Sequence, residues 1–326
     1  MNLRNPYRAL NVPPSALKST IVPSGDLAAN LASFSRHLRA ANLSPATQRT
    51  YRASLDRMCD FLASRGMPTE VASIRREHLE AFIENQLETW TPATAANRYS
   101  GIRPFFNWLV EEGEIKESPM ARMRKPRLPE HAPPILADEE VERLLRMSDG
   151  PGFAERRDTA IIRTFLATGA RLSEVANLRW TPEDPANNDV DLDRGLIRVM
   201  GKGRRERSVY VGVRAVKALD RYLRARQRHR LAEQPFLWVG EKGRMTDSGI
   251  AQMLRRRGRQ AQLPRLHAHA FRHHYAHEAL AAGMQEGEVM ALAGWRSREM
   301  LSRYAKSGER DRAIAAAKRV GLGDRI

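Results

Sequence analysis

The sequence predicts a mainly α-helical protein with two domains: four helices first, then a larger, mainly helical domain with a small antiparallel sheet near its start. Three observations support this prediction. The chain has 326 residues, enough for two domains with separate cores. Apolar residues recur at three- and four-residue steps through most of the chain, and strand patterns are confined to a few short stretches. A basic, proline-rich stretch divides the two helical parts.

The N-terminal part combines a tail at residues 1–24 with a helical domain at residues 25–118. Repeated prolines in the tail predict weak order, so we expect a flexible segment there. Ser44-Pro45 and Thr91-Pro92 each resemble an N-cap followed by proline at the first helical position. Short loops predict that the helices form one compact four-helix domain. The apolar stripes of the four helices are Leu27, Leu31, Phe34 and Leu38; Tyr51, Leu55, Met58, Phe61 and Leu62; Leu79, Phe82, Ile83 and Leu87; and Ile102, Phe105, Phe106 and Leu109.

The linker and the second domain follow. Residues 119–134 are the expected linker, because their prolines remove backbone donors and favour extended chain. Its cations either lie along a phosphate backbone or belong to a plain spacer. The second domain, residues 135–326, is expected to begin with a helix near Asp138. Its further elements are a helix over 157–167, short strands at 196–199 and 208–211, a mostly helical pattern from residue 213 onward that is interrupted at 236–239, and a short amphipathic helix at about 309–322.

The charge balance points to a polyanionic partner. The formal net charge is +17 and basic residues are spread along the chain, which favours nucleic acid over membrane; a merely solvated basic surface is the alternative. No apolar run approaches the roughly 18 residues that span a bilayer, and the N-terminus lacks a secretory signal pattern. A single cysteine, Cys59, excludes an intrachain disulfide framework and suits a reducing cytosol. We therefore expect a cytoplasmic, nucleoid-associated protein.

Two basic side chains stand in settings that suit anion binding. Arg171 opens a short segment whose apolar residues are expected to face the core, and Glu174 lies three positions further on. The pair is either a surface ion pair or an orienting contact that presents the Arg171 guanidinium to two phosphate oxygens. Lys202 stands between two glycines, which permit a tight turn, and the spacing is not that of a P-loop. Lys202 is either a solvated hairpin residue or a mobile proton donor.

Histidines cluster between residues 267 and 277. His273 and His277 stand four apart on an expected helix, as metal ligands often do, but the second histidine of a zinc-protease motif and any nearby cysteine are missing. We therefore expect no metal. The other interpretation places His269 and Arg272 at a helix start, where the helix N-terminus adds positive potential for an anion.

The order and spacing of these residues, with Trp295 and Tyr304 after them, match one family. From about residue 27 to 320 the chain resembles the tyrosine recombinases, the phage-integrase family of site-specific DNA recombinases. Phe271 replaces the leucine usual in the family, and Trp295 occupies the position of its usual histidine. The motifs are Ala170-Arg171-Leu172-Ser173-Glu174, Gly201-Lys202-Gly203 with Arg207, His269-Ala270-Phe271-Arg272-His273, Ala293-Gly294-Trp295 and Tyr304. The resemblance identifies the two domains as a SAM-like core-binding domain and a mixed α/β catalytic domain.

The resemblance implies a mechanism. Tyr304 would attack a phosphodiester of duplex DNA, forming a 3′-phosphotyrosyl link and freeing a 5′-hydroxyl. Arg171 and Arg272 would neutralise the phosphorane as a metal does elsewhere, so that no metal, cofactor or ATP is needed. Lys202 would protonate the 5′-oxygen, and His269 would act as general base. The residues expected to support the site are Trp295, which donates to the phosphate or packs beside it, Glu174 and His273.

The resemblance also implies partners. Four protomers would act on two DNA sites, and the C-terminal helix would dock on a neighbouring protomer; packing on its own domain is the alternative. A bacterial, phage or plasmid origin is expected, and dimer resolution, phage integration and transposon movement stay open. Two rival functions are type IB topoisomerase-like relaxation and non-catalytic DNA binding by the same fold. The expected DNA contacts are Arg98, Arg103, Arg124, Lys125, Arg127, Arg204, Arg205 and Arg207.

Overall fold

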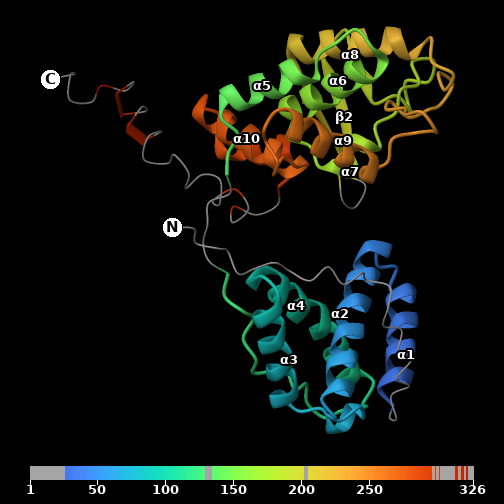
Figure 1. The fold of residues 1–326 in the computed structure, drawn as a ribbon, viewed down its shortest axis with the longest axis vertical. Helices are drawn as coiled ribbons and strands as arrows, with labels where there is room; N and C mark the ends of the chain where they lie inside the picture. The colour runs from blue at the N-terminus through green and yellow to red at the C-terminus, as the bar shows by residue number, and fades with distance from the viewer. Residues whose placement is uncertain are drawn as a thin grey trace, which may run out of the picture. The chain divides into compact units, whose positions relative to one another are not determined.

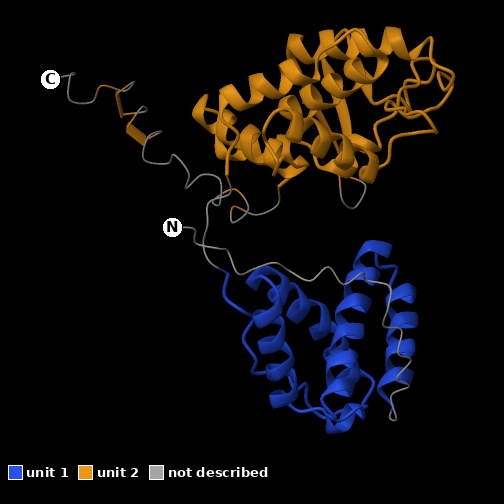
Figure 2. Ribbon diagram, in the orientation of Figure 1, with its two compact units in different colours: residues 1–130 blue, residues 131–326 orange. Residues whose placement is uncertain are grey.

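The computed structural model describes residues 26–128, 134–201 and 205–295, together with residues 298, 301, 313, 314, 317, 318 and 321. The chain divides into two compact units, residues 1–130 and residues 131–326 (Figure 2). Of the predicted site residues, Lys202, Arg204 and Tyr304 lie outside the described residues. Most of the helix expected at about 309–322 lies outside them too, and so does the N-terminal tail.

The described part of unit 1 is a bundle of four α-helices (Figure 1). The side-chain oxygen of Ser44 accepts a hydrogen bond from the backbone N–H of Thr47 at 3.2 Å, and Thr91 caps Thr94 in the same way at 3.3 Å. Both predicted helix starts are therefore confirmed. The elements are α1 (Leu27–Ala40), α2 (Pro45–Ser64), the 3-10 helix η1 (Val71–Ser73), α3 (Arg76–Thr89) and α4 (Pro92–Glu111).

The core of unit 1 forms where the four apolar stripes meet. Phe34 of α1 packs edge-on against Phe105 of α4, with ring centroids 5.4 Å apart, and Trp108 lies 5.5 Å from Phe34. On another side of α4, a Cβ at Gly101 would clash with the side chain of Ser54 on α2. Glycine at this position therefore lets α2 and α4 approach closely.

Unit 2 places helices around a small sheet (Figure 1). Its described strands are antiparallel in the order β1-β2-β3, and the β2–β3 register runs from Leu196 opposite Tyr210 to Gly201 opposite Arg205. The elements are α5 (Asp138–Ser148), α6 (Phe153–Thr168), α7 (Leu172–Ala176), β1 (Val190–Asp191), β2 (Leu196–Gly201), β3 (Arg205–Tyr210), α8 (Gly212–Arg226), α9 (Asp247–Gln260), α10 (Ala268–Ala281) and α11 (Glu286–Ala293).

Two sequence expectations for unit 2 need correction. Helix α6 begins at Phe153, four residues before the expected start, because Gly152 takes the N-cap position in an extended conformation. The interruption of the helical pattern at 236–239 is also wider than expected, because α8 ends at Arg226 and α9 begins at Asp247. Within it Phe236 makes an isolated bridge with Arg179, Val239 makes another with Arg244, and Trp238 is buried in the core.

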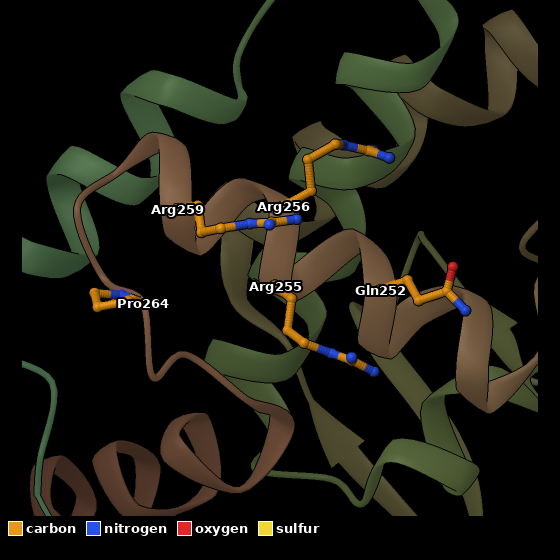
Figure 3. Close-up of a pocket in the computed structure, with 5 residues that line it drawn as sticks. All are labelled: Gln252, Arg255, Arg256, Arg259 and Pro264. Carbon is orange, nitrogen blue, oxygen red and sulfur yellow. The ribbon is translucent and has the colours of Figure 1, made fainter. Parts of the chain in front are cut away.

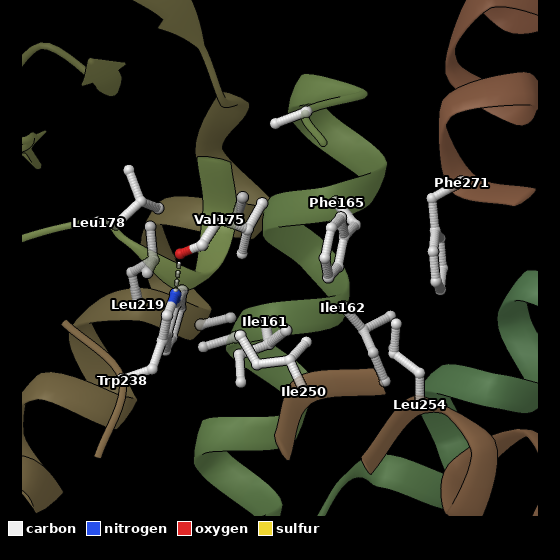
Figure 4. Close-up of a cluster of buried hydrophobic side chains, with 14 of the residues drawn as sticks. Ile161, Ile162, Phe165, Val175, Leu178, Leu219, Trp238, Ile250, Leu254 and Phe271 are labelled. Atoms are coloured by element: carbon white, nitrogen blue, oxygen red, sulfur yellow. Dashed lines mark hydrogen bonds between the residues drawn. The ribbon is translucent and has the colours of Figure 1, made fainter. Parts of the chain in front are cut away.

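The core of unit 2 is built on α6 (Figure 4). Ile161, Ile162 and Phe165 of α6 are fully buried. Phe165 stacks on Phe271 of α10 with ring centroids 5.5 Å apart. The indole N–H of Trp238 donates to the backbone carbonyl of Val175 in α7 at 2.8 Å, as the dashed line in Figure 4 shows. These contacts fix α7 and the first half of α10 to the same central helix, and both carry predicted site residues.

Candidate active site

Arg171 is positioned by the turn that ends α6. Gly169 terminates the helix with a left-handed backbone conformation, φ +54°. A Cβ there would lie 2.6 Å from Cδ1 of Tyr275, so the turn requires glycine for both conformation and space. Arg171 follows two residues later as the N-cap of α7, and its backbone N–H donates to Oε2 of Glu174 at 2.8 Å. The turn and this cap contact therefore fix Arg171 at the start of α7.

The Arg171–Glu174 pair is not an isolated surface ion pair. The guanidinium of Arg171 donates to Oε1 of Glu174 at 2.8 Å, and Arg207 of β3 donates to both carboxylate oxygens at 3.2 and 2.7 Å. The side chain of Glu174 is only 3% exposed, whereas that of Arg171 remains 32% exposed. Of the two interpretations left open by the sequence, the structure supports the orienting contact.

The environment of Glu174 keeps it ionised. Burial by itself raises the pKa of this carboxyl, but hydrogen bonds from Arg207 and from the backbone of Arg171 outweigh it and lower the pKa to about 2. At neutral pH the carboxylate therefore holds both guanidinium groups in place. The third group of Arg207, Nε, donates to the carbonyl of Leu292 at 2.7 Å, which ties β3 to α11.

Arg171 and Arg272 converge on one short segment at the end of α11. Arg272, in the first half of α10, donates to the carbonyl of Gly169 at 2.8 Å and to that of Ala293 at 2.6 Å. Arg171 donates to the next carbonyl, that of Gly294, at 3.1 Å. Two guanidinium groups from distant parts of the sequence thus meet at consecutive peptide carbonyls, which is the main geometric feature of the site.

Trp295 follows this segment directly. Its side chain is buried, and the guanidinium carbon of Arg272 lies 4.9 Å from the centre of its ring. Gly294 has φ +66°, and a Cβ there would come within 3.0 Å of Nη1 of Arg207. The glycine therefore lets the α11 terminus close over the arginines. The structure gives Trp295 a cation–π contact with a predicted catalytic residue.

Two histidines of α10, His269 and His273, have pKa values below the ordinary value for histidine. Burial, followed by the charge of Arg272 and the neighbouring His267 and Arg171, lowers the pKa of His269. Burial, followed by His269, lowers the pKa of His273 to about 4. The two rings stack with centroids 6.2 Å apart, one helical turn from each other. A neutral His269 beside two cations is able to accept a proton near neutral pH.

The structure thus brings together the predicted residues Arg171, Glu174, Arg272, Trp295 and His269. It adds two features that sequence reasoning missed. The first is Arg207: it was predicted to contact DNA, and this stays a prediction, but the hydrogen bonds described for its guanidinium all lie within the protein. The second is the pair of carbonyls at 293 and 294, for which the sequence offered only the glycine as a signal.

Predicted DNA contacts of unit 1 lie on or near α4. Arg98 lines a hollow of about 480 Å³ between α2 and α4, opposite Arg49. Burial and the charge of Arg57 lower the pKa of Arg98. The remaining predicted cations of this unit, Arg103, Arg124, Lys125 and Arg127, are exposed. The hollow is open enough to admit a backbone phosphate.

A second basic hollow, not predicted from the sequence, lies on α9 (Figure 3). Arg255 and Arg259 stand on one face of the helix, and Pro264 lies across from them. Arg256 points instead toward α6, where it donates to Oδ2 of Asp158 at 3.0 Å. The hollow measures about 490 Å³ and carries no acidic side chain among its described lining residues.

One group of described side chains has atoms close enough to share a cation: Asp138, His274 and Glu278, within 4.8 Å of one another. It differs from the pair considered in the sequence, His273 and His277. Nδ1 of His274 lies 2.9 Å from the carbonyl of Leu136. Asp138 and Glu278 are exposed, and none of the three belongs to the arginine cluster, so the group has no part in the site built above.

The fold consists of a helical unit followed by a mainly helical unit, and the second unit carries the cluster of Arg171, Glu174, Arg207 and Arg272. This combination defines a class of protein with a candidate anion site. Comparison with known proteins gives its family. The phage integrase family matches residues 134–310, and the N-terminal SAM-like domain of phage integrases matches residues 31–113. The chain belongs to the phage integrase family, that of the tyrosine recombinases. Both the predicted family and the predicted fold class are confirmed.

Individual relatives agree with this family assignment. The tyrosine recombinase XerC of Oceanobacillus iheyensis is 30% identical over 263 residues, which cover 78% of this chain and 84% of the relative. Among solved structures, XerH site-specific recombinase bound to a palindromic difH substrate has a TM-score of 0.70 at 19% identity, covering 88% of this chain and 83% of that one. A lambda integrase tetramer bound to a Holliday junction has a TM-score of 0.64 at 14% identity, covering 83% and 77%.

These findings favour a recombinase over topoisomerase-like relaxation and over a non-catalytic role. Among the helices that the structure describes, none combines the length and the apolar character that a membrane span requires.

Proposed function

We propose that this tyrosine recombinase cuts and rejoins duplex DNA at specific sites, with its scissile phosphate held by Arg171 and Arg272. The observation that carries this proposal is the convergence of the two guanidinium groups on the carbonyls of Ala293 and Gly294. Cations held in place before the reaction stabilise developing negative charge without a cost of reorganisation during it. Arg171 retains exposed surface for a phosphate oxygen, and Glu174 fixes its direction.

The reaction consists of two transesterifications. The phenol oxygen of Tyr304 forms a bond to phosphorus, and the bond from phosphorus to the 5′-oxygen breaks. His269 takes the phenol proton, consistent with its lowered pKa, and Lys202 gives a proton to the departing 5′-oxygen. A 5′-hydroxyl from a partner strand then attacks the phosphorus of the 3′-phosphotyrosyl link; the bond to the Tyr304 oxygen breaks, the proton transfers run in reverse, and a phosphodiester is restored. The number of phosphoester bonds is conserved, so the sequence needs no external energy source.

Trp295 and His273 support the charged groups of the site without taking part in the proton transfers. Trp295 packs against the guanidinium of Arg272 and confines it. His273 stacks on His269, and its own lowered pKa keeps it neutral while His269 takes up the proton. Trp295 is therefore a positioning residue in this proposal, which also explains why tryptophan is able to replace a histidine there.

DNA binding would use both units. The hollow with Arg49 and Arg98 and the hollow with Arg255 and Arg259 supply cations that contact backbone phosphates. Exposed cations within the expected linker, Arg124, Lys125 and Arg127, would follow the same backbone. Affinity should then fall steeply with salt concentration.

The proposal also includes the assembly of protomers on DNA. Four protomers would join two DNA sites, with the segment at about 309–322 docking on a neighbouring protomer. Support comes from a solved relative of the same fold, the lambda integrase tetramer bound to a Holliday junction. The nucleoid is the compartment in which such a protein would work.

The proposed nucleophile is tested by Tyr304→Phe. The variant should form no covalent protein–DNA adduct while its DNA affinity stays at the wild-type level, because only the phenol oxygen is lost. Tyr210→Phe is the matched control, since Tyr210 on β3 is 63% exposed and its hydroxyl has no place in the mechanism. The adducts are counted after denaturing electrophoresis. Adducts that persist in Tyr304→Phe contradict the assignment.

A further inference from the structure

A groove on the surface of unit 2 has a marked excess of positive charge. It lies between α5, α6 and α8 and measures about 310 Å³. Its floor includes the apolar side chains of Leu145 and Ala218. The charged residues that line it are Arg146, Asp149, Arg163, Arg214, Lys217 and Arg221.

The acidic side chains nearby do not neutralise this charge. The single carboxylate among the described lining residues, Asp149, is paired with Arg221 at 3.4 Å. Arg146 is paired with Glu142 of its own helix, also at 3.4 Å. Within the part of the chain that the structure describes, Arg163, Arg214 and Lys217 make no ion pair with a carboxylate. The groove therefore presents five cations against one carboxylate, that of Asp149, whose charge also acts on Arg163.

Arg163 makes this arrangement more than a solvated surface. Its side chain is half-buried on α6, and burial, followed by the charge of Arg214, lowers its pKa. A cation that loses water and gains a like-charged neighbour raises the free energy of the folded protein unless an anion joins it. A bound anion would relieve both effects at once.

The spacing on α8 directs the cations to a common face. Arg214, Lys217 and Arg221 stand three and four residues apart, so their side chains lie on the same side of the helix. Two of the five cations are guanidinium groups without a partner, and their planar fork matches two oxygens of a phosphate. The volume of the groove is close to that of small-ligand sites, about 300 Å³ or more.

This groove is separate from the arginine cluster of the active site. None of its lining residues hydrogen-bonds with Arg171, Glu174, Arg207 or Arg272. Figure 1 shows α8 and α7 on opposite sides of unit 2, with β2 and α9 between them. An anion in the groove is thus not the scissile phosphate.

We propose that the groove between α5, α6 and α8 is a second phosphate site, which takes clustered phosphate groups either as a free polyphosphate or as the backbone of a further nucleic acid segment. The C-terminal tail of this chain is a poor occupant, because its basic residues outnumber its acidic ones after Tyr304. The proposal does not depend on the chemistry assigned to Tyr304.

The test uses the full chain and a pair of double variants that lose equal charge from the same region. Arg214→Gln with Lys217→Gln removes two groove cations; Arg224→Gln with Arg228→Gln removes two exposed cations outside the groove, one on α8 and one just after it. Calorimetric titration with inorganic tripolyphosphate should show affinity at least about tenfold weaker in the groove variant and near wild type in the control. That result identifies a site for free polyphosphate.

A second arm uses a short duplex of unrelated sequence. If the groove holds nucleic acid backbone, the slope of log affinity against log salt should become shallower by about 2 in the groove variant and should change less in the control. The proposal is overturned if neither arm separates the two variants. It is also overturned if hexaglutamate binds the wild type as tightly as tripolyphosphate, since the groove would then select negative charge in general.

Discussion

Unit 2 contains two clusters in which arginines surround a buried carboxylate, and they differ in what they leave exposed. Asp158 on α6 is fully buried and accepts hydrogen bonds from Arg157, Arg256 and Arg257. Glu174 on α7 is almost as buried and accepts from Arg171 and Arg207. Around Asp158, the donors of Arg157 go to the carboxylate and to the carbonyl of Val239.

The difference lies in what surrounds the arginines and not in exposure alone, since the side chain of Arg256 beside Asp158 is 51% exposed. Arg157 and Arg257 are about as buried as the core; Arg257 joins α9 to α6 through Asp158, and Arg157 reaches the carbonyl of Val239. Arg171 keeps a third of its side chain exposed, and beside it Arg272 is balanced by carbonyl oxygens and the Trp295 ring rather than by a second carboxylate. The same set of groups therefore makes a buried structural ion-pair cluster in one place and, in our proposal, an anion site in the other.

The largest effect on stability should come from Asp158→Asn. The substitution keeps the shape and removes the charge, which leaves Arg157 and Arg257 buried without their partner. We expect the free energy of unfolding to fall by about 3–5 kcal/mol. Urea unfolding measures the change. Asp220→Asn, which breaks the exposed pair with Arg224, is the control and should cost less than about 1 kcal/mol. If both variants lose a similar amount of unfolding free energy, the buried Asp158 cluster is no different from an exposed ion pair.

The largest effect on the reaction should come from Arg272→Ala. Loss of a cation aimed at the phosphorane should slow covalent adduct formation by about 100-fold or more. Arg256→Ala, taken from the other cluster, should leave the rate per folded molecule near wild type. Single-turnover adduct formation at matched concentrations of folded protein gives both rates. If Arg256→Ala is as slow as Arg272→Ala, the two clusters do not differ in function.

A smaller effect concerns acid stability. Because the pKa of Glu174 is about 2 in the folded protein, against an ordinary value of 4.5, the ionised carboxylate stabilises the fold above about pH 4.5. This stabilisation is lost as the pH falls from there toward 2, and it is on the order of 2 kcal/mol. The difference in unfolding free energy between wild type and Glu174→Gln should therefore shrink on acidification. A difference that stays constant down to about pH 3 would show that Glu174 is not held ionised in this way.

Local signals in the sequence predicted much of the fold. Ser44-Pro45 and Thr91-Pro92 start helices because their caps act within four residues. The apolar stripes on α1 to α4 became the core of unit 1, except that Leu87 at the end of its stripe is exposed. The interruption at 236–239 was predicted, but not its extent from the end of α8 to the start of α9, because an apolar segment that buries a tryptophan has no local periodicity that marks its bounds.

The site was only partly accessible from the sequence, for a physical reason. The sequence indicates that Arg171 and Glu174 are three residues apart, but burial decides whether such a pair is a weak surface contact or a fixed one. That burial depends on Arg207, 33 positions away, and on carbonyls more than 120 positions away. The order of the motifs identified the family. That Arg171 and Arg207 share the Glu174 carboxylate, and that two arginines meet at the carbonyls of residues 293 and 294, became visible only in the structure.

The central claim is that the arginine site presents a DNA phosphate to Tyr304, and mapping the covalent adduct tests it most directly. The wild-type protein is incubated with DNA that flanks its own gene, the adduct is digested with trypsin, and the nucleotide-bearing peptide is identified by mass spectrometry. The account predicts a nucleotide linked through a 3′-phosphate to the peptide Tyr304-Ala305-Lys306. A nucleotide attached to any other residue would contradict it.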